Sequence, residues 1–140
     1  MKNIIIALLS FTSVLTTAQS LTFNSLDLIK SKSKIEIETF LKKNNFSFSS
    51  DQPKSVQWKS KDNNILIQFN GKGVLVFLTY DIQSYKKMIL DLKKSKYKYF
   101  GKTRKNNADV ESYLKGKETI FLTTMKNLEN NKQIYSITFI

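Results

Sequence analysis

Residues 81–105 decide how this chain is interpreted, and they read DIQSYKKMILDLKKSKYKYFGKTRK. In their first part, apolar side chains recur at spacings of three and four residues, which is typical of an amphipathic helix. Asp81 stands where a helix N-cap belongs. The predicted buried stripe of this helix consists of Ile82, Tyr85, Met88, Ile89 and Leu92. We therefore expect this stretch to lay one face of a helix on a sheet.

A sequence motif at the end of this stretch also occurs in the first half of the chain. The pattern Leu-Lys-Lys-x-x-aromatic-x-aromatic occurs at 92–99 and also at 41–48. Three strand-like segments follow each copy, and Trp58 and Tyr113 take similar places in the first of them. One such unit cannot cover its own sheet, whereas two side by side can. We expect an α+β fold of tandem α-β-β-β units that form a mostly antiparallel sheet with helices on one face.

The N-terminus has the features of a secretory signal peptide. Lys2 precedes an apolar run to Leu15, and Ala18 ends a small-residue cleavage site. The run is shorter than the roughly 20 residues that span a bilayer. We expect residues 1–18 to be cleaved and 19–140 to form a single domain, with pseudo-repeats at about 24–80 and 81–140. The mature protein would then be periplasmic or secreted.

The composition disfavours most catalytic chemistry. The chain has no cysteine and no histidine, which removes a disulfide framework, the commonest general base and the commonest metal ligand. No acidic pair has the spacing of a glycosidase dyad or a calcium loop, although Asp109 and Glu111 face the same side of a predicted strand. We expect no enzyme, no cofactor and no metal site. The enzyme alternative requires a pocket that holds two or more acids with a lysine or tyrosine.

The formal net charge of +12 favours an anionic partner. Nine basic residues lie between 86 and 105 against one acid, Asp91, and aromatic residues are interleaved with them. A polyanion or an anionic envelope surface is one candidate partner, while Arg104, the only arginine, makes nucleic acid a poor one. Against this, the 22 lysines, 12 asparagines and 14 isoleucines match AT-rich codons, and a solvated helix face explains the lysines as well. The candidate residues are Lys93, Lys94, Lys96, Lys98, Tyr97 and Tyr99.

The strands offer a second candidate surface. The predicted strand 74–80 is apolar on both faces, although helices are expected on only one. Either these residues complete the core, or an apolar and aromatic face is left for a protein partner, since aromatic residues are enriched at interface centres. The candidate contact residues are Trp58, Phe77, Tyr113 and Phe121.

The Lys/Asn/Ile-rich composition, the cleavage site Thr17-Ala18-Gln19 and the repeated Leu-Lys-Lys motif resemble small exported proteins common in Bacteroidetes. This resemblance covers the length of the protein and includes no catalytic motif. In architecture the layout also resembles the β-lactamase inhibitor protein, whose tandem units form a sheet that grips an enzyme. That resemblance implies a protein-binding sheet face. The inhibitor's disulfides have no counterpart here, and no contact residue can be carried over.

Together these features predict an exported, non-enzymatic binding module that meets an unknown protein partner through a sheet face. The alternative is a polyanion- or envelope-binding protein that uses the Lys86–Lys105 cluster.

Overall fold

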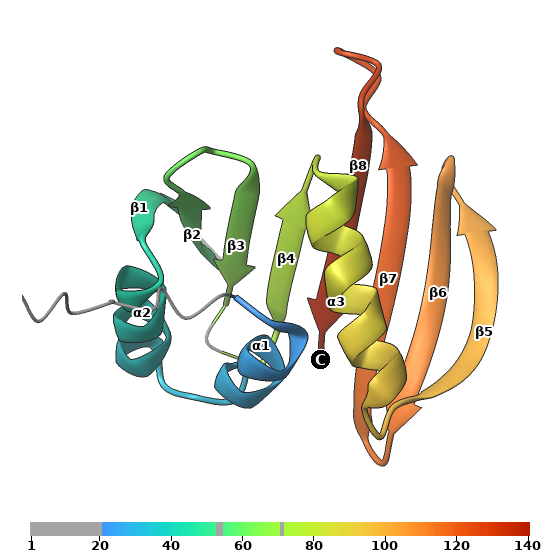
Figure 1. Cartoon of the computed structure of the whole chain (residues 1–140), viewed down its shortest axis with the longest axis horizontal. Coiled ribbons are helices and arrows are strands. Elements are labelled where there is room, and N and C mark those ends of the chain that lie inside the picture. The colour runs from blue at the N-terminus through green and yellow to red at the C-terminus, as the bar shows by residue number, and fades with distance from the viewer. Residues whose placement is uncertain (1–20, 53–54, 71) are drawn as a thin grey trace, which may run out of the picture.

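The computed structural model describes residues 21–52, 55–70 and 72–140, so the predicted signal peptide at 1–18 lies outside the described residues. Figure 1 shows the helices in front of a broad sheet. In chain order, the elements are α1 (Phe23–Ile29), α2 (Lys34–Lys43), β1 (Phe46–Gln52), β2 (Ser55–Ser60), β3 (Ile65–Phe69), β4 (Leu75–Thr79), α3 (Ile82–Lys94), β5 (Lys98–Lys105), β6 (Ala108–Lys115), β7 (Glu118–Lys126) and β8 (Gln133–Phe139).

Each helix begins where a side chain can accept hydrogen bonds from the first backbone amides, which have no partner within the helix. Ser33 and Glu36 form a capping box at α2, and the Asp81 carboxylate accepts from two amides of α3. Both agree with the sequence: Asp81 was predicted as an N-cap, and Ser33-Lys34-Ile35-Glu36 is a capping-box pattern. At α1 the sequence pattern favours Asn24 as the N-cap, but the cap is Thr22, so the helix starts two residues earlier.

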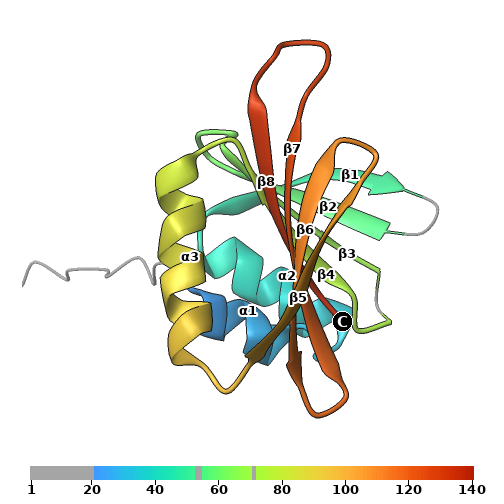
Figure 2. The same cartoon turned by 90° about the vertical axis from the view of Figure 1, so that its right-hand side faces the viewer.

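The eight strands form one antiparallel sheet in the order β1-β2-β3-β4-β8-β7-β6-β5. The first half of the chain (α1–β4) and the second half (α3–β8) each contribute a four-stranded meander. The two meanders join at the centre, where Phe77 in β4 pairs with Ile137 in β8. Figures 1 and 2 show the helices on one side of the sheet. The predicted α+β class, with helices on one face of an antiparallel sheet, is confirmed.

The number of strands per half differs from the prediction, because each half has four strands instead of three. The additional strands are β1 and β5, which lie outside the three strand-like segments that were predicted for each half. Both are edge strands, so each pairs on one side only and has few buried positions. Polar residues therefore fill them, and the apolar alternation that marks an inner strand is absent.

The repeated motif has the same structure in both halves. A β-bulge follows Phe48 in β1 and Tyr99 in β5. These two rings meet the rings of Trp58 and Tyr113 edge to face, with centroids 6.0 and 5.4 Å apart. Phe48 and Tyr99 are 56% and 58% exposed, whereas the first aromatic residue of each motif is buried. Those buried residues are Phe46 and Tyr97.

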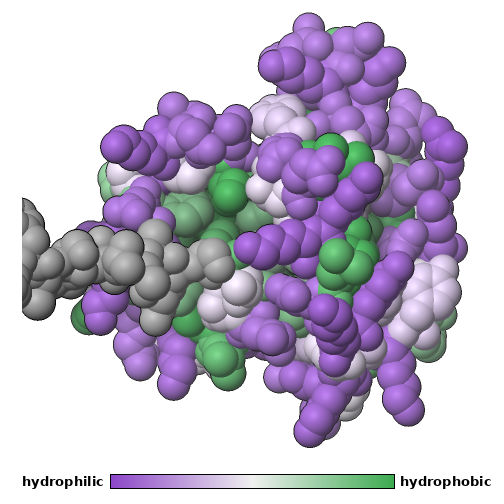
Figure 3. Space-filling model, viewed as in Figure 1, coloured by the Kyte–Doolittle hydropathy of each residue, from purple (hydrophilic) through white to green (hydrophobic). Residues whose placement is uncertain are grey.

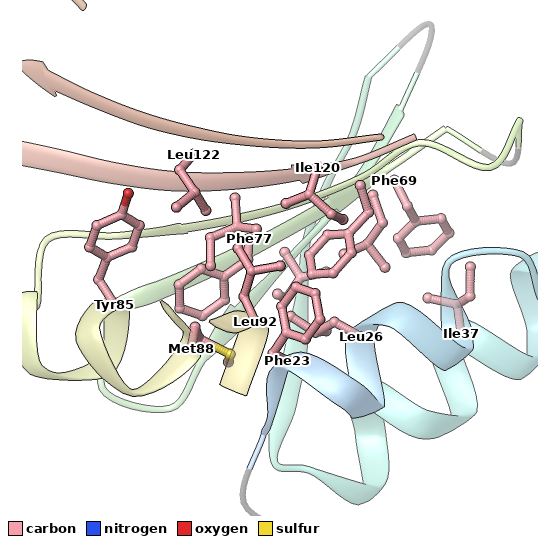
Figure 4. Packing of buried hydrophobic residues seen from close by; sticks show 14 of the residues in the cluster. Phe23, Leu26, Ile37, Phe69, Phe77, Tyr85, Met88, Leu92, Ile120 and Leu122 are labelled. Atoms are coloured by element: carbon pink, nitrogen blue, oxygen red, sulfur yellow. The ribbon is translucent and has the colours of Figure 1, made fainter. Parts of the chain in front are cut away.

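The core lies entirely between the helices and one face of the sheet. Figure 4 shows its side chains pointing from the strands toward α1, α2 and α3. From α3 it takes Tyr85, Met88 and Leu92, as the periodicity predicted, while Ile89 packs at its margin. Ile82 is 40% exposed, since the first turn of α3 extends past the covered part of the sheet. None of the described helices lies on the opposite face of the sheet, here called the outer face (Figure 2).

Candidate functional site

The outer face is built from the strand positions that alternate with the core positions. Strand registers align them into rows across the sheet. One row runs Leu66, Leu78, Ser136, Thr123 and Val110. The next runs Gln57, Gln68, Val76, Thr138, Phe121 and Ser112. Across the six strands from β2 to β6, these rows span roughly 24 Å at the usual strand spacing.

This face combines apolar and hydroxyl side chains and has no negative charge. Leu66, Val76, Leu78 and Phe121 are half-buried, because they are screened by their strand neighbours and not by another layer. Within β2–β8 every carboxylate of a strand lies on the helix side of the sheet. The charges on the outer face are lysines at its two margins. They are Lys59 on β2 and Lys98 and Lys105 on β5.

The structure separates the four strand aromatics that the sequence analysis grouped as contact residues. Trp58, Phe77 and Tyr113 are at most 6% exposed and point into the core. A partner cannot contact them, so they are withdrawn as candidates. Phe121 lies on the outer face, paired with Thr138 of β8. Strand alternation alone does not tell the two faces apart, and the positions of the helices decide which one is covered.

The lysines of the second candidate site lie on the surface of the protein. Lys93, Lys94, Lys96 and Lys98 are all exposed, and none of them has an ion pair within the described part of the chain. Tyr97 does not belong to this surface. It is 6% exposed, and its hydroxyl is hydrogen-bonded to Lys30 and Asp27, at the end of α1 and within it. Tyr99 remains on the surface.

A polar hollow of about 190 Å³ lies between α3 and strands β5–β7. Lys102 Nζ is 3.8 Å from a carboxylate oxygen of Asp109 and 3.9 Å from one of Glu111. The Tyr113 hydroxyl donates to Glu111 at 3.3 Å. Burial raises the pKa of Tyr85 at the rim of the hollow, and a hydrogen bond with Thr124 only partly offsets this.

The hollow unites Asp109 and Glu111 with Lys102 and Tyr85, which is the combination that the enzyme alternative requires. Its volume is nevertheless below the 300–1,000 Å³ or so of ordinary ligand sites, and it has room for about six waters. Both carboxylates already face a lysine or a tyrosine hydroxyl. We therefore interpret Asp109, Glu111 and Lys102 as a structural ion-pair group and not as a substrate site.

Comparison with known protein families, curated proteins and solved structures found no significant match to this chain. In the described ranges, no helix is long and apolar enough to cross a bilayer. Nor does any group of three or more acidic side chains in those ranges gather into a possible metal site. The candidate sites therefore depend on the geometry and charge of this chain alone.

Of the outer-face residues, only Phe121 was predicted as a contact residue from the sequence. Val76 and Leu78 were noted only as the second apolar face of one strand. Thr123 and Ser136 carry no signal of their own, because a hydroxyl residue in a strand suits a core edge, a solvated face or an interface equally. Only the register reveals the continuous surface, because it pairs residues as far apart in the sequence as Val76 and Thr138.

Proposed function

We propose that this protein is an exported, non-enzymatic binding module that docks an acidic protein partner on the outer face of its sheet. The observation that carries the proposal is the combination of an uncovered, uncharged centre with lysine margins and no carboxylate. An uncharged centre with a charged rim is the usual anatomy of a protein interface. The span of the rows suits the roughly 800 Å² per partner that a standard interface buries.

The acidic nature of the partner follows from charge complementarity. The chain has a formal net charge of +12, and Lys59, Lys98 and Lys105 border the face on opposite sides. A basic partner, including a second copy of this chain, would be repelled during approach, whereas an acidic one would be steered toward the face.

Charge substitutions at Thr123, in the middle of the face, test this function. We expect Thr123→Glu to abolish capture of the partner from a native envelope extract, because it places a negative charge opposite an acidic surface. Thr123→Lys has similar bulk and the opposite charge, and it should retain most of the capture. The measurement is quantitative mass spectrometry of proteins retained by each immobilised variant.

Gln83→Glu on α3 is the matched control, since it adds the same charge on the helix side. The proposal requires a protein that wild type, Gln83→Glu and Thr123→Lys retain and Thr123→Glu loses. If every retained protein is indifferent to the sign of the charge at position 123, the outer face is not the binding site. Unfolding curves of all variants confirm that the fold is unchanged.

Export is tested separately. When the full chain is expressed with its own N-terminus in a Gram-negative host, we expect processed protein whose first residue is Gln19. Intact-mass measurement on the periplasmic and medium fractions checks this. Full-length protein confined to the cytoplasm would contradict export. It would not bear on the binding surface, which the Thr123 variants test.

A further inference from the structure

A second surface lies at the turn from α3 into β5, at residues 93–100, here called the α3–β5 corner. Four of its eight residues are exposed lysines, and it includes no acid. Leu92 and Tyr97 are buried and fix the corner to the core on either side of Lys93–Lys96. The lysine head groups are therefore displayed from a well-anchored turn.

Exposed aromatic rings accompany these lysines. Tyr99 is 58% and Phe100 is 73% exposed. Phe100 is the additional residue of the bulge in β5 and has no partner in the β6 register. On α3, Leu90 is 58% exposed among lysines, and Figure 3 shows hydrophobic patches over this helix surrounded by hydrophilic surface. Single exposed apolar residues are ordinary on a protein surface, so what distinguishes the corner is that Tyr99 and Phe100 are adjacent to each other and to its lysines.

The first half of the chain provides an internal comparison. The same helix-to-bulge turn at 42–49 begins with two lysines, as the corner does. Beyond those lysines and the aromatic pair Phe46 and Phe48, which matches Tyr97 and Tyr99, it carries small polar residues. The differences that add charge or an apolar ring to the corner are Asn45 against Lys96, Ser47 against Lys98 and Ser49 against Phe100. Because both turns have the same backbone plan, the fold does not require the additional lysines or the phenylalanine.

We infer that the α3–β5 corner contacts an anionic lipid surface. Lysine ammonium groups bind lipid phosphates, and their aliphatic stems lie along the headgroup region. Aromatic rings settle at the boundary between headgroups and acyl chains, where Phe100 and Tyr99 would enter. A soluble polyanion would use the lysines, but it would gain little from an exposed phenylalanine. The corner lies at the β5 edge of the sheet, so lipid contact leaves the centre of the outer face free.

The test transplants the first half's residues into the second. The variant Lys96→Asn/Lys98→Ser/Phe100→Ser is compared with wild type by co-sedimentation with vesicles of phosphatidylglycerol and phosphatidylcholine in equal parts. We expect its partition coefficient to fall roughly a hundred-fold, about thirty-fold from the two lysines and several-fold from Phe100. Neither protein should bind pure phosphatidylcholine vesicles strongly. All proteins carry the same residues 1–18, so the contribution of these residues cancels in the comparison.

The matched control is Lys43→Asn/Lys61→Ser/Leu128→Ser, which removes two exposed lysines and one exposed apolar residue elsewhere. It should keep most of the binding. Equal losses in the two triple variants would show that binding follows net charge alone, which overturns the inference. Phe100→Ser alone should weaken vesicle binding several-fold and leave heparin retention unchanged. If it leaves vesicle binding unchanged as well, the corner binds soluble polyanions and not a lipid surface.

Discussion

Replacing Phe77 with alanine is expected to lower the free energy of unfolding by about 3–5 kcal/mol. Phe77 is fully buried at the centre of β4, where it pairs with Ile67 on one side and Ile137 on the other. Figure 4 shows its ring between the sheet and α3, so truncation opens a cavity at the point where the two halves join. Urea unfolding followed by the fluorescence of Trp58, the only tryptophan, measures the loss.

Phe121→Ala makes the same deletion on the opposite face of the sheet. Because Phe121 is half-buried and no described helix covers it, we expect a loss of about 1 kcal/mol. Partner capture should show the opposite order: Phe121→Ala weakens binding more than Phe77→Ala does. Equal destabilisation by the two substitutions would contradict the assignment of Phe77 to the core and Phe121 to an open surface.

Local chemistry made parts of this fold predictable. The caps at Ser33 and Asp81 and the stripe of α3 depend on residues within two turns of each other, so the sequence displays them directly. The two edge strands depend instead on a neighbour elsewhere in the chain. The stretch FSFSSDQ and the stretch KYFGKTRK are strands because β2 and β6 supply hydrogen-bond partners, whereas their own propensity is weak.

The candidate site was predictable only in outline. The sequence of β4 is apolar on both faces, so it does not tell whether Phe77 or Leu78 points into the core until the helices are placed. The contact residues predicted from the sequence were large aromatic residues, and these are the side chains that gain most from burial in a core. The open face is instead built of medium-sized and hydroxyl side chains, such as Val76 and Thr123, whose grouping depends on register.

A partly buried charge network also joins the two halves, and no local signal marks it. Lys30, at the end of α1, is 7% exposed, and its Nζ donates to Asp27 and to the Tyr97 hydroxyl, both at 2.8 Å. The same Nζ lies 3.6 Å from Glu118 at the start of β7. Lys115 Nζ completes the group, 2.6 Å from Glu118. Since these contacts span up to 88 residues of sequence, only the fold brings them together.

The network shifts the acids in a direction that fixes its pH dependence. Burial raises the pKa of Asp27, but hydrogen bonds from Lys30 and Tyr97 and the charges of Lys30 and Lys115 outweigh it, so the net pKa is lowered. Hydrogen bonds from Lys115 and Tyr97 lower the pKa of Glu118. An acid with a depressed pKa contributes stability above its unfolded-state pKa and loses it as the pH falls through the folded value. The network should therefore weaken below about pH 4.

Lys30→Met is expected to cost about 1–3 kcal/mol of unfolding free energy at pH 7, because the half-buried Asp27 carboxylate loses its closest cation and keeps only Lys115, 3.4 Å away. Without Lys30, the pKa of Asp27 should lie higher in the variant than in the wild type. Protonation near pH 3 then removes the buried charge, so the gap between wild type and variant should narrow at acid pH. Urea unfolding at pH 3, 5 and 7 measures this gap.

Two controls separate charge from packing in this result. Asp27→Asn/Lys30→Met removes both charges and should be more stable at pH 7 than Lys30→Met alone, since a neutral pair avoids the unpaired carboxylate. Lys34→Met breaks an exposed pair, 4.0 Å from Glu38, and should change stability by less than about 1 kcal/mol. If Lys30→Met costs the same at pH 3 as at pH 7, the loss is one of packing, and the charge network does not hold α1 to the second half.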